Sequence, residues 1–125
     1  MTDPKKMLIV DDDHDMAESI ADLVEIRGYE ADLASSGSEA IAKFQERNYD
    51  IAFMDVRMPG MNGVECLLEI LKLKPDAKVV MMTAYSVEQL LRTALNNGAA
   101  GVLYKPFEMA EFLALCGNGK GADTS

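Results

Sequence analysis

Five short apolar runs recur along the chain, and four of them stop at a polar or charged side chain. Runs of this length, bounded by turn residues, are typical of strands buried in a sheet. The fifth run, Tyr29–Leu33, is predicted to be a strand as well. The other four, with the residues that follow them, are Lys6–Val10 before Asp11 and Asp12, Asp50–Met54 before Asp55, Lys78–Met82 before Thr83, and Gly101–Tyr104 before Lys105.

The segments between these runs carry apolar residues at intervals of three and four, the spacing of amphipathic helices. Typical helix starts precede them: capping boxes at Ser36–Glu39 and Ser86–Gln89, and Asn62 as the N-cap of a third helix. Gly28 and Gly98 follow two helices where a left-handed residue is expected. The predicted helices run from about Asp13 to Arg27, from Ser36 through Phe44, from Asn62 to Pro75, from Ser86 to Asn97, and from about Glu108 through Leu115.

The same spacing predicts which side of each helix faces the core. A helix buries the residues that recur every three or four positions and exposes the rest. The residues expected to face inward include Leu23 and Val24 in the first helix, Val64, Leu67, Leu68 and Leu71 in the third, and Leu91 and Leu95 in the fourth.

Strands that alternate with helices through short connections predict a parallel sheet covered on both faces, with right-handed crossovers. The carboxyl ends of parallel strands lie at one edge, which is where ligands bind in open α/β sheets. The polar residues that end the four runs are therefore expected to meet at that edge. The order of the strands cannot be read from periodicity.

Three carboxylates at one edge would repel one another, and a hard divalent cation such as Mg²⁺ would remove the conflict. A carboxylate oxygen of Asp55 could then attack phosphorus and form an aspartyl phosphate. Lys105 would supply a mobile positive charge, and Thr83 a hydroxyl that donates to a phosphoryl oxygen. Taken singly, each residue has an ordinary alternative: a turn aspartate, a solvated lysine or a strand threonine.

Four short motifs lie at these strand ends: Val10-Asp11-Asp12, Asp55 with Met58–Gly63, Thr83-Ala84 and Lys105-Pro106-Phe107. Each motif is short, but the four together, in this order and at this spacing, are specific. On these motifs the chain, to about Leu115, resembles the receiver domain of two-component response regulators. The resemblance implies a flavodoxin-like sheet with strand order 2-1-3-4-5.

The resemblance also implies a role for each matching residue. Asp55 corresponds to the phosphoacceptor, Thr83 to the switch hydroxyl and Lys105 to the phosphate-binding lysine. The implied Mg²⁺ ligands are Asp11, Asp12, Asp55 and the backbone carbonyl of Arg57.

The family takes its phosphoryl group from a sensor histidine kinase or phosphotransfer protein, and signals to an output domain or downstream protein. A receiver domain of this family catalyses its own phosphotransfer and dephosphorylation but turns over no separate substrate. The resemblance therefore implies a signalling receiver rather than an enzyme. In much of the family an aromatic residue precedes the lysine by three positions. Here that position is Val102, and Tyr104 shares its face of the strand.

Composition and charge limit the number of domains and the classes of partner that are expected. With 125 residues the chain is expected to form one domain, residues 1–116, followed by a flexible glycine-rich tail, residues 117–125. A net charge of -9 without clustered basic residues argues against direct nucleic-acid binding. No apolar run is long enough for a membrane span and no signal peptide is recognisable, so a cytoplasmic location is expected. Cys66 and Cys116 lack metal-ligand spacing and are interpreted as reduced packing thiols.

A different class of protein shares some of these features. Small metal-dependent phosphohydrolases of the haloacid-dehalogenase kind carry an Asp-x-Asp nucleophile motif after the first strand, which Asp11–Asp13 matches loosely. The motif lacks its final threonine, no cap insertion is present, and the chain is short for that fold. The position of a covalent phosphate, on Asp55 or on Asp11, distinguishes the two hypotheses.

Overall fold

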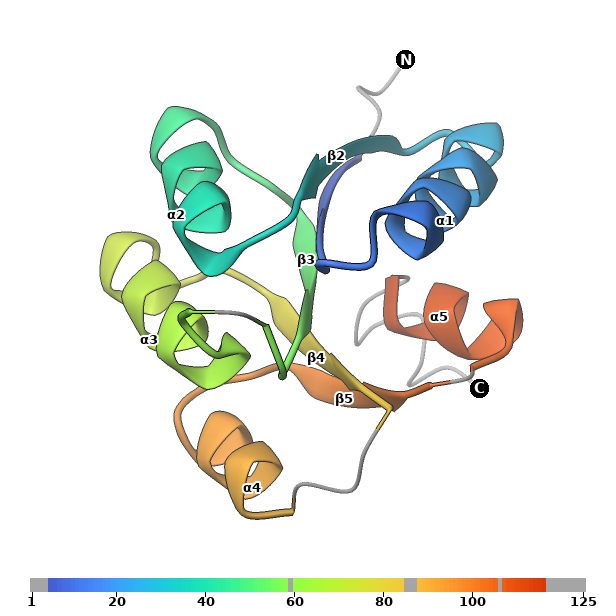
Figure 1. Ribbon diagram of the computed structural model, residues 1–125. Helices are drawn as coiled ribbons and strands as arrows, with labels where there is room; N and C mark the ends of the chain where they lie inside the picture. The colour runs from blue at the N-terminus through green and yellow to red at the C-terminus, as the bar shows by residue number, and fades with distance from the viewer. Residues whose placement is uncertain (1–4, 59, 85–87, 106, 117–125) are drawn as a thin grey trace.

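The apolar runs form a five-stranded sheet in which every neighbouring pair of strands is parallel (Figure 1). The computed structural model describes residues 5–58, 60–84, 88–105 and 107–116. The strand order is β2-β1-β3-β4-β5, which confirms the flavodoxin-like order that the resemblance implied. The strands are β1 (Lys6–Val10), β2 (Glu30–Ala34), β3 (Ile51–Asp55), β4 (Val79–Thr83) and β5 (Gly101–Tyr104).

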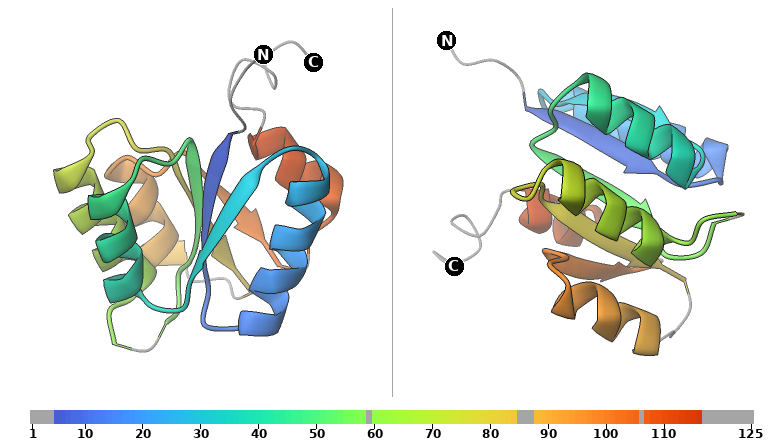
Figure 2. Two further views of the ribbon diagram at one scale, coloured as in Figure 1. Left: turned by 90° about the horizontal axis from the view of Figure 1, so that it is seen from above. Right: turned by 90° about the vertical axis from the view of Figure 1, so that its left-hand side faces the viewer.

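Helices cover both faces of this sheet (Figure 2). One face packs against α1 and α5, and the other against α2, α3 and α4. The fold therefore has three layers, with the central sheet buried on both sides. The helices are α1 (His14–Ile26), α2 (Gly37–Glu46), α3 (Gly63–Leu73), α4 (Glu88–Asn96) and α5 (Met109–Cys116).

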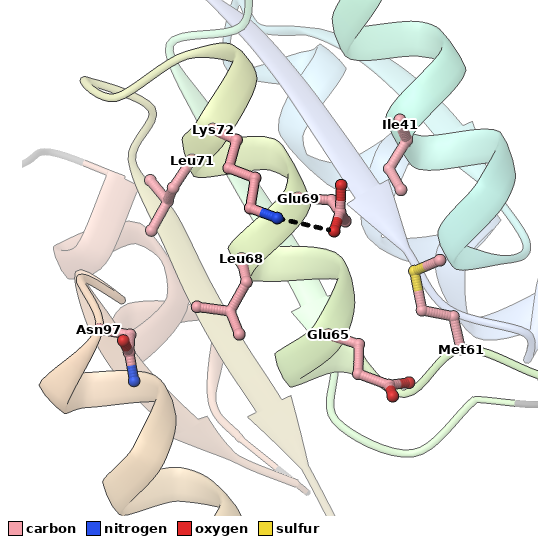
Figure 3. A pocket seen from close by; sticks show the side chains of 8 residues that line it. All are labelled: Ile41, Met61, Glu65, Leu68, Glu69, Leu71, Lys72 and Asn97. Atoms are coloured by element: carbon pink, nitrogen blue, oxygen red, sulfur yellow. Dashed lines mark hydrogen bonds and ion pairs between the residues drawn. The ribbon is translucent and has the colours of Figure 1, made fainter.

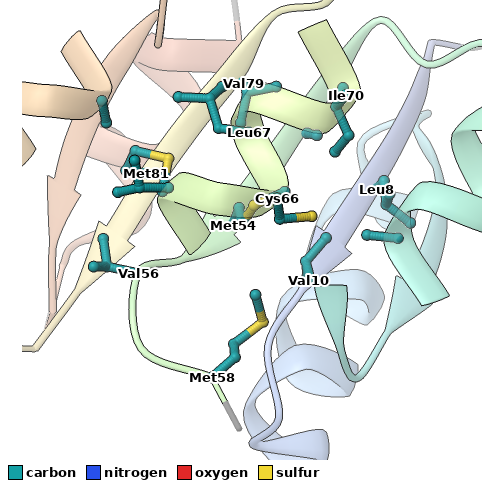
Figure 4. Packing of buried hydrophobic residues seen from close by; sticks show 14 of the residues in the cluster. Leu8, Val10, Met54, Val56, Met58, Cys66, Leu67, Ile70, Val79 and Met81 are labelled. Atoms are coloured by element: carbon teal, nitrogen blue, oxygen red, sulfur yellow. The ribbon is translucent and has the colours of Figure 1, made fainter. Parts of the chain in front are cut away.

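The central strands are apolar on both faces because both faces are covered. In β1, Leu8 and Val10 pack toward α2 and α3, whereas Met7 and Ile9 pack toward α1 and α5. Every residue of β3 and β4 is buried. Figure 4 shows the cluster on the α2 and α3 side, which continues from the sheet into the loop after β3 through Val56 and Met58. This packing fixes the strand ends that carry the polar residues.

The predicted starts of α1 and α3 are confirmed. Asp13 caps α1 by accepting a hydrogen bond from the Met16 backbone N–H at 3.1 Å. At α3, the Asn62 side chain accepts from the Glu65 backbone N–H, and the Glu65 carboxylate accepts from the Asn62 N–H, which completes a capping box.

The α2 start differs in one respect. Ser36 accepts from the Glu39 N–H as expected, but the Glu39 carboxylate accepts from the N–H and hydroxyl of Ser35 instead of completing the box with Ser36. The predicted box at Ser86 lies largely outside the described residues.

The predicted inward face of α3 is partly wrong. Val64 and Leu67 are buried as expected, but Cys66 and Ile70 complete the buried face, while Leu68 and Leu71 are only partly buried. The reason is that α3 carries more apolar residues than one helix face can bury, so spacing alone does not select the buried set. Two further residues expected inside are exposed: Leu23 in α1 and Leu95 in α4.

Both cysteines are buried and free, as expected of packing thiols. Burial raises the pKa of Cys66 to about 12 and that of Cys116 to about 11. A raised pKa leaves almost no reactive thiolate at neutral pH. We therefore expect both thiols to react with a chromogenic disulfide reagent at least about 100-fold more slowly in the native protein than in denaturant. Fast reaction of either thiol without denaturant would contradict this packing.

Among the described residues, no helix is both long enough and apolar enough to cross a membrane. Residues 117–125 lie outside the described part of the chain, so the division into a domain and a tail stays a prediction.

Candidate functional site

Four of the predicted site residues come together at the carboxyl edge of the sheet. Asp11 follows β1, Asp55 and Thr83 end β3 and β4, and Lys105 follows β5. Asp11, Asp55 and Thr83 are the buried polar residues within the described core, with exposed fractions of 1%, 9% and 0%. Buried polar side chains need partners, so their arrangement at this edge is informative.

Lys105 joins the two buried carboxylates. Its Nζ donates hydrogen bonds to Asp11 Oδ2 at 2.7 Å and to Asp55 Oδ2 at 2.9 Å. These are charge-assisted contacts at short distance, made by a lysine side chain that is only 14% exposed. The contact connects the end of β5 to the ends of β1 and β3, neither of which is its neighbour in the sheet.

The second oxygen of each carboxylate is held by its own loop. Asp11 Oδ1 accepts a hydrogen bond from the Asp13 backbone N–H at 2.9 Å. Asp55 Oδ1 accepts one from the Arg57 N–H at 3.0 Å. In both cases the bond spans two residues, the local turn that aspartate favours. Each carboxylate is thus oriented by a local bond on one oxygen and by Lys105 on the other.

The electrostatics of the site reflect burial and excess negative charge. Burial raises the pKa of Asp11, and the hydrogen bonds from Lys105 and the Asp13 N–H offset this only in part. Burial alone would lower the pKa of Lys105, but its hydrogen bonds to Asp11 and Asp55 outweigh this effect and raise it. Lys105 is therefore held in its charged form. Its single positive charge faces the two carboxylates of Asp11 and Asp55, so the negative charge of the site is only partly neutralised.

A third carboxylate completes an oxygen-rich group. One carboxylate oxygen from each of Asp11, Asp12 and Asp55 lies within 4.8 Å of the others. Asp12 is exposed, whereas Asp11 and Asp55 are buried. Hard oxygen donors of this kind suit divalent cations such as Mg²⁺ or Ca²⁺. The raised pKa of Asp11 fits the same conclusion, because a nearby cation would relieve the cost of its buried charge.

The loop after β3 is held against α3 by a glycine whose role the sequence did not reveal. The Gly63 N–H donates to the Val56 carbonyl at 2.8 Å. A Cβ added at Gly63 would lie 2.3 Å from the Asp55 carbonyl oxygen and 2.9 Å from Val56 Cα. Only glycine permits this approach. A glycine soon after a strand that ends in a candidate functional residue is the signal that could have indicated it.

Other predicted features lie nearby. The Arg57 side chain is exposed, and its N–H holds Asp55, but a metal-binding role for its carbonyl stays a prediction. Val102 packs against the same cluster as Leu8 and Val10, on the face of the sheet covered by α2, α3 and α4, while Tyr104 is 56% exposed. Pro106, part of the lysine motif, lies outside the described residues. Sequence reasoning also missed that Lys105 binds both aspartates directly, because this contact joins residues 94 and 50 positions apart.

Comparison with known proteins extends these observations. The family model for the response regulator receiver domain matches residues 7–116. The chemotaxis protein CheY of Thermotoga maritima is 38% identical over 105 residues, which cover 83% of this chain and 88% of that protein. The chain also matches longer transcriptional regulatory proteins, spanning 47% of one and 23% of another.

Solved structures agree with this result. A CheY-like receiver domain protein from Methanospirillum hungatei has a TM-score of 0.90 at 30% identity, with 98% of this chain and 99% of that chain covered. The structure of a CheX-CheY-BeF3-Mg complex from Borrelia burgdorferi has a TM-score of 0.82 at 34% identity, with 88% of this chain and 84% of that chain covered.

Proposed function

Since the chain belongs to the family of response regulator receiver domains, we propose that Asp55 is the side chain on which it accepts a phosphoryl group. The family role is that of a phosphoacceptor in two-component signalling. One observation carries the assignment to Asp55: this carboxylate ends the central strand β3, and Lys105 joins it to Asp11 within the acidic group. The haloacid-dehalogenase alternative is not favoured by the family match or the fold.

The proposed reaction with a small phosphodonor is a simple displacement. An oxygen of Asp55 forms a bond to phosphorus, and the bond between phosphorus and the acetyl oxygen of acetyl phosphate breaks, which releases acetate. Lys105 then exchanges Asp55 Oδ2 for a phosphoryl oxygen, and the Thr83 hydroxyl donates to another. Both residues already lie at the edge where the phosphoryl group would form.

A divalent cation fits the oxygen-rich group, and we assign it as Mg²⁺. Asp11, Asp12, Asp55 and the Arg57 carbonyl are the proposed ligands. When bound, the ion would neutralise charge on the phosphoryl oxygens. The chain's own contribution is to hold its carboxylates at fixed positions through the Asp13 and Arg57 N–H groups and Lys105.

Receiver domains work with kinases and output domains, and the proposed partners follow that pattern. A sensor histidine kinase or phosphotransfer protein in the cytoplasm supplies the phosphoryl group. The receiver catalyses this transfer and its own dephosphorylation. The added charge at Asp55 then shifts the surface formed by α4 and β5, which an output domain or downstream protein recognises.

Intact-mass spectrometry after incubation with acetyl phosphate tests the proposal. We expect the mass of one phosphoryl group to appear with Mg²⁺ and to form at least about 100-fold more slowly when EDTA replaces it, because the metal offsets repulsion between the phosphodonor and the carboxylates. Hydroxylamine, which cleaves acyl phosphates, is expected to remove the adduct.

Peptide mapping after borohydride reduction locates the adduct. Phosphate on the peptide that contains Asp55 supports the proposal. An adduct on Asp11 would instead support the phosphohydrolase hypothesis, and an adduct that forms equally fast in EDTA would exclude the metal from the reaction.

A further inference from the structure

A groove of about 670 Å³ crosses the face of the molecule formed by α2, α3 and α4 (Figure 3). The exposed side of α3 forms its floor, with Ile41 of α2 on one side and Asn97, just after α4, on the other. This groove uses none of the residues of the phosphorylation site. It includes Leu68 and Leu71, the two residues of α3 that are only partly buried although the apolar spacing predicts them to face inward.

The floor of the groove is apolar. Leu68 and Leu71 project from α3, and Ile41 and Met61 close the α2 side. All four side chains are partly exposed. Apolar side chains gathered in one concave surface are typical of sites that bind a ligand or a partner, whereas scattered ones need no explanation.

Acidic side chains stand among these apolar ones. Glu65 and Glu69, one helical turn apart on α3, both line the groove. Among the described residues of the lining the one basic side chain is Lys72, whose Nζ lies 3.4 Å from Glu69 Oε2 in an exposed ion pair. Such pairs are weak and exchange partners easily. The groove therefore presents a net negative charge together with its apolar floor.

We propose that this groove is the docking site for a basic amphipathic helix of a partner protein. Helices on both sides of a helical floor form the type of groove in which an amphipathic helix binds by its apolar face. Lysine or arginine residues at the edges of that face would pair with Glu65 and Glu69. A second copy of this chain is a poor occupant, because each copy carries a charge of -9 and the two would repel each other.

The groove is also continuous with the loop that follows Asp55. Met61 belongs to this loop, and a Cβ added at Gly37, the first residue of α2, would lie 3.1 Å from the Met61 sulfur. The next residue, Asn62, caps α3. A helix in the groove would thus contact the loop directly, although docking itself needs no phosphorylation and can be tested independently of it.

The test uses a synthetic helical peptide with leucines at i, i+3, i+4 and i+7 and lysines elsewhere, titrated into the isotopically labelled, unphosphorylated chain. We expect backbone amide signals of α3, Ile41 and Met61 to shift. The same peptide with glutamates in place of lysines is expected not to bind.

Paired variants distinguish docking from general attraction to an acidic protein. Glu65→Gln with Glu69→Gln keeps a cap-forming side chain at position 65 and is expected to weaken binding about tenfold. Leu68→Gln is expected to weaken it similarly. The matched controls lie on α1: Asp22→Asn with Glu25→Gln, and Ile26→Gln, whose parent side chain is 79% exposed. Binding is expected to change less than about twofold in these controls.

Three results would overturn the proposal: no binding of the lysine peptide, signal shifts centred on another face, or equal weakening by the groove and α1 variants. Circular dichroism of each variant establishes that it remains folded. None of these outcomes depends on whether Asp55 accepts phosphate.

Discussion

The Asp55→Asn variant is expected to form no detectable aspartyl phosphate with acetyl phosphate and Mg²⁺. An amide oxygen is a far weaker nucleophile than a carboxylate, and the neutral side chain binds a divalent cation less tightly. The loss should be at least about 1,000-fold in rate, because a nucleophile is removed rather than weakened. Intact-mass spectrometry over a time course measures it.

The fold should survive this substitution. The asparagine can still accept the hydrogen bond from the Arg57 N–H, and one of several clustered negative charges disappears. Urea unfolding is therefore expected to show stability equal to or above that of the native chain. Asp22→Asn, an exposed change on α1, serves as the control and should phosphorylate normally. A stable adduct in Asp55→Asn would place the nucleophile elsewhere, with Asp11 the first residue to examine.

The Gly63→Ala variant is expected to lose about 3 kcal/mol of unfolding free energy, a large effect for the addition of one methyl group. The added Cβ would overlap the Asp55 carbonyl oxygen, 2.3 Å away, and approach Val56 Cα. Both are backbone atoms, so the strain cannot be relieved by rotating a side chain. The start of α3 must move away from β3, and the hydrogen bond from the Gly63 N–H to the Val56 carbonyl weakens.

Chemical denaturation measures this loss, and Gly101→Ala provides the matched control. A Cβ at Gly101 would meet only Leu115 Cδ2 at 3.5 Å, which is ordinary contact. We expect that substitution to change stability by less than about 1 kcal/mol. If Gly63→Ala were equally mild, the close approach of α3 to the Asp55 backbone would not be the constraint we describe. A folded Gly63→Ala protein should also phosphorylate more slowly, because its Asp55 loop is displaced.

The acidic site shows which features can be predicted from local sequence patterns and which cannot. Asp11, Asp55, Thr83 and Lys105 each ended an apolar run, and parallel strands bring such ends to one edge, so their meeting could be predicted. The direct contacts of Lys105 with both aspartates could not be predicted, because nothing in the local sequence directs its side chain toward them rather than into solvent. Burial of Asp11 and Asp55 decides the matter, since buried charges need neighbours of opposite sign.

The strands, the helices, the cap at Asn62 and the residues at the sheet edge were predictable from the amino-acid sequence alone. These features depend on neighbours within a few positions, where periodicity and turn chemistry act. Three features follow only from the packing of the whole fold: how far Leu68 and Leu71 are buried, how closely Gly63 approaches the Asp55 backbone, and where Lys105 binds. Those outcomes depend on how helices and strands pack across the sheet. When a helix such as α3 has apolar residues on more than one face, its sequence does not specify which face is buried, and only its neighbours in the fold do so.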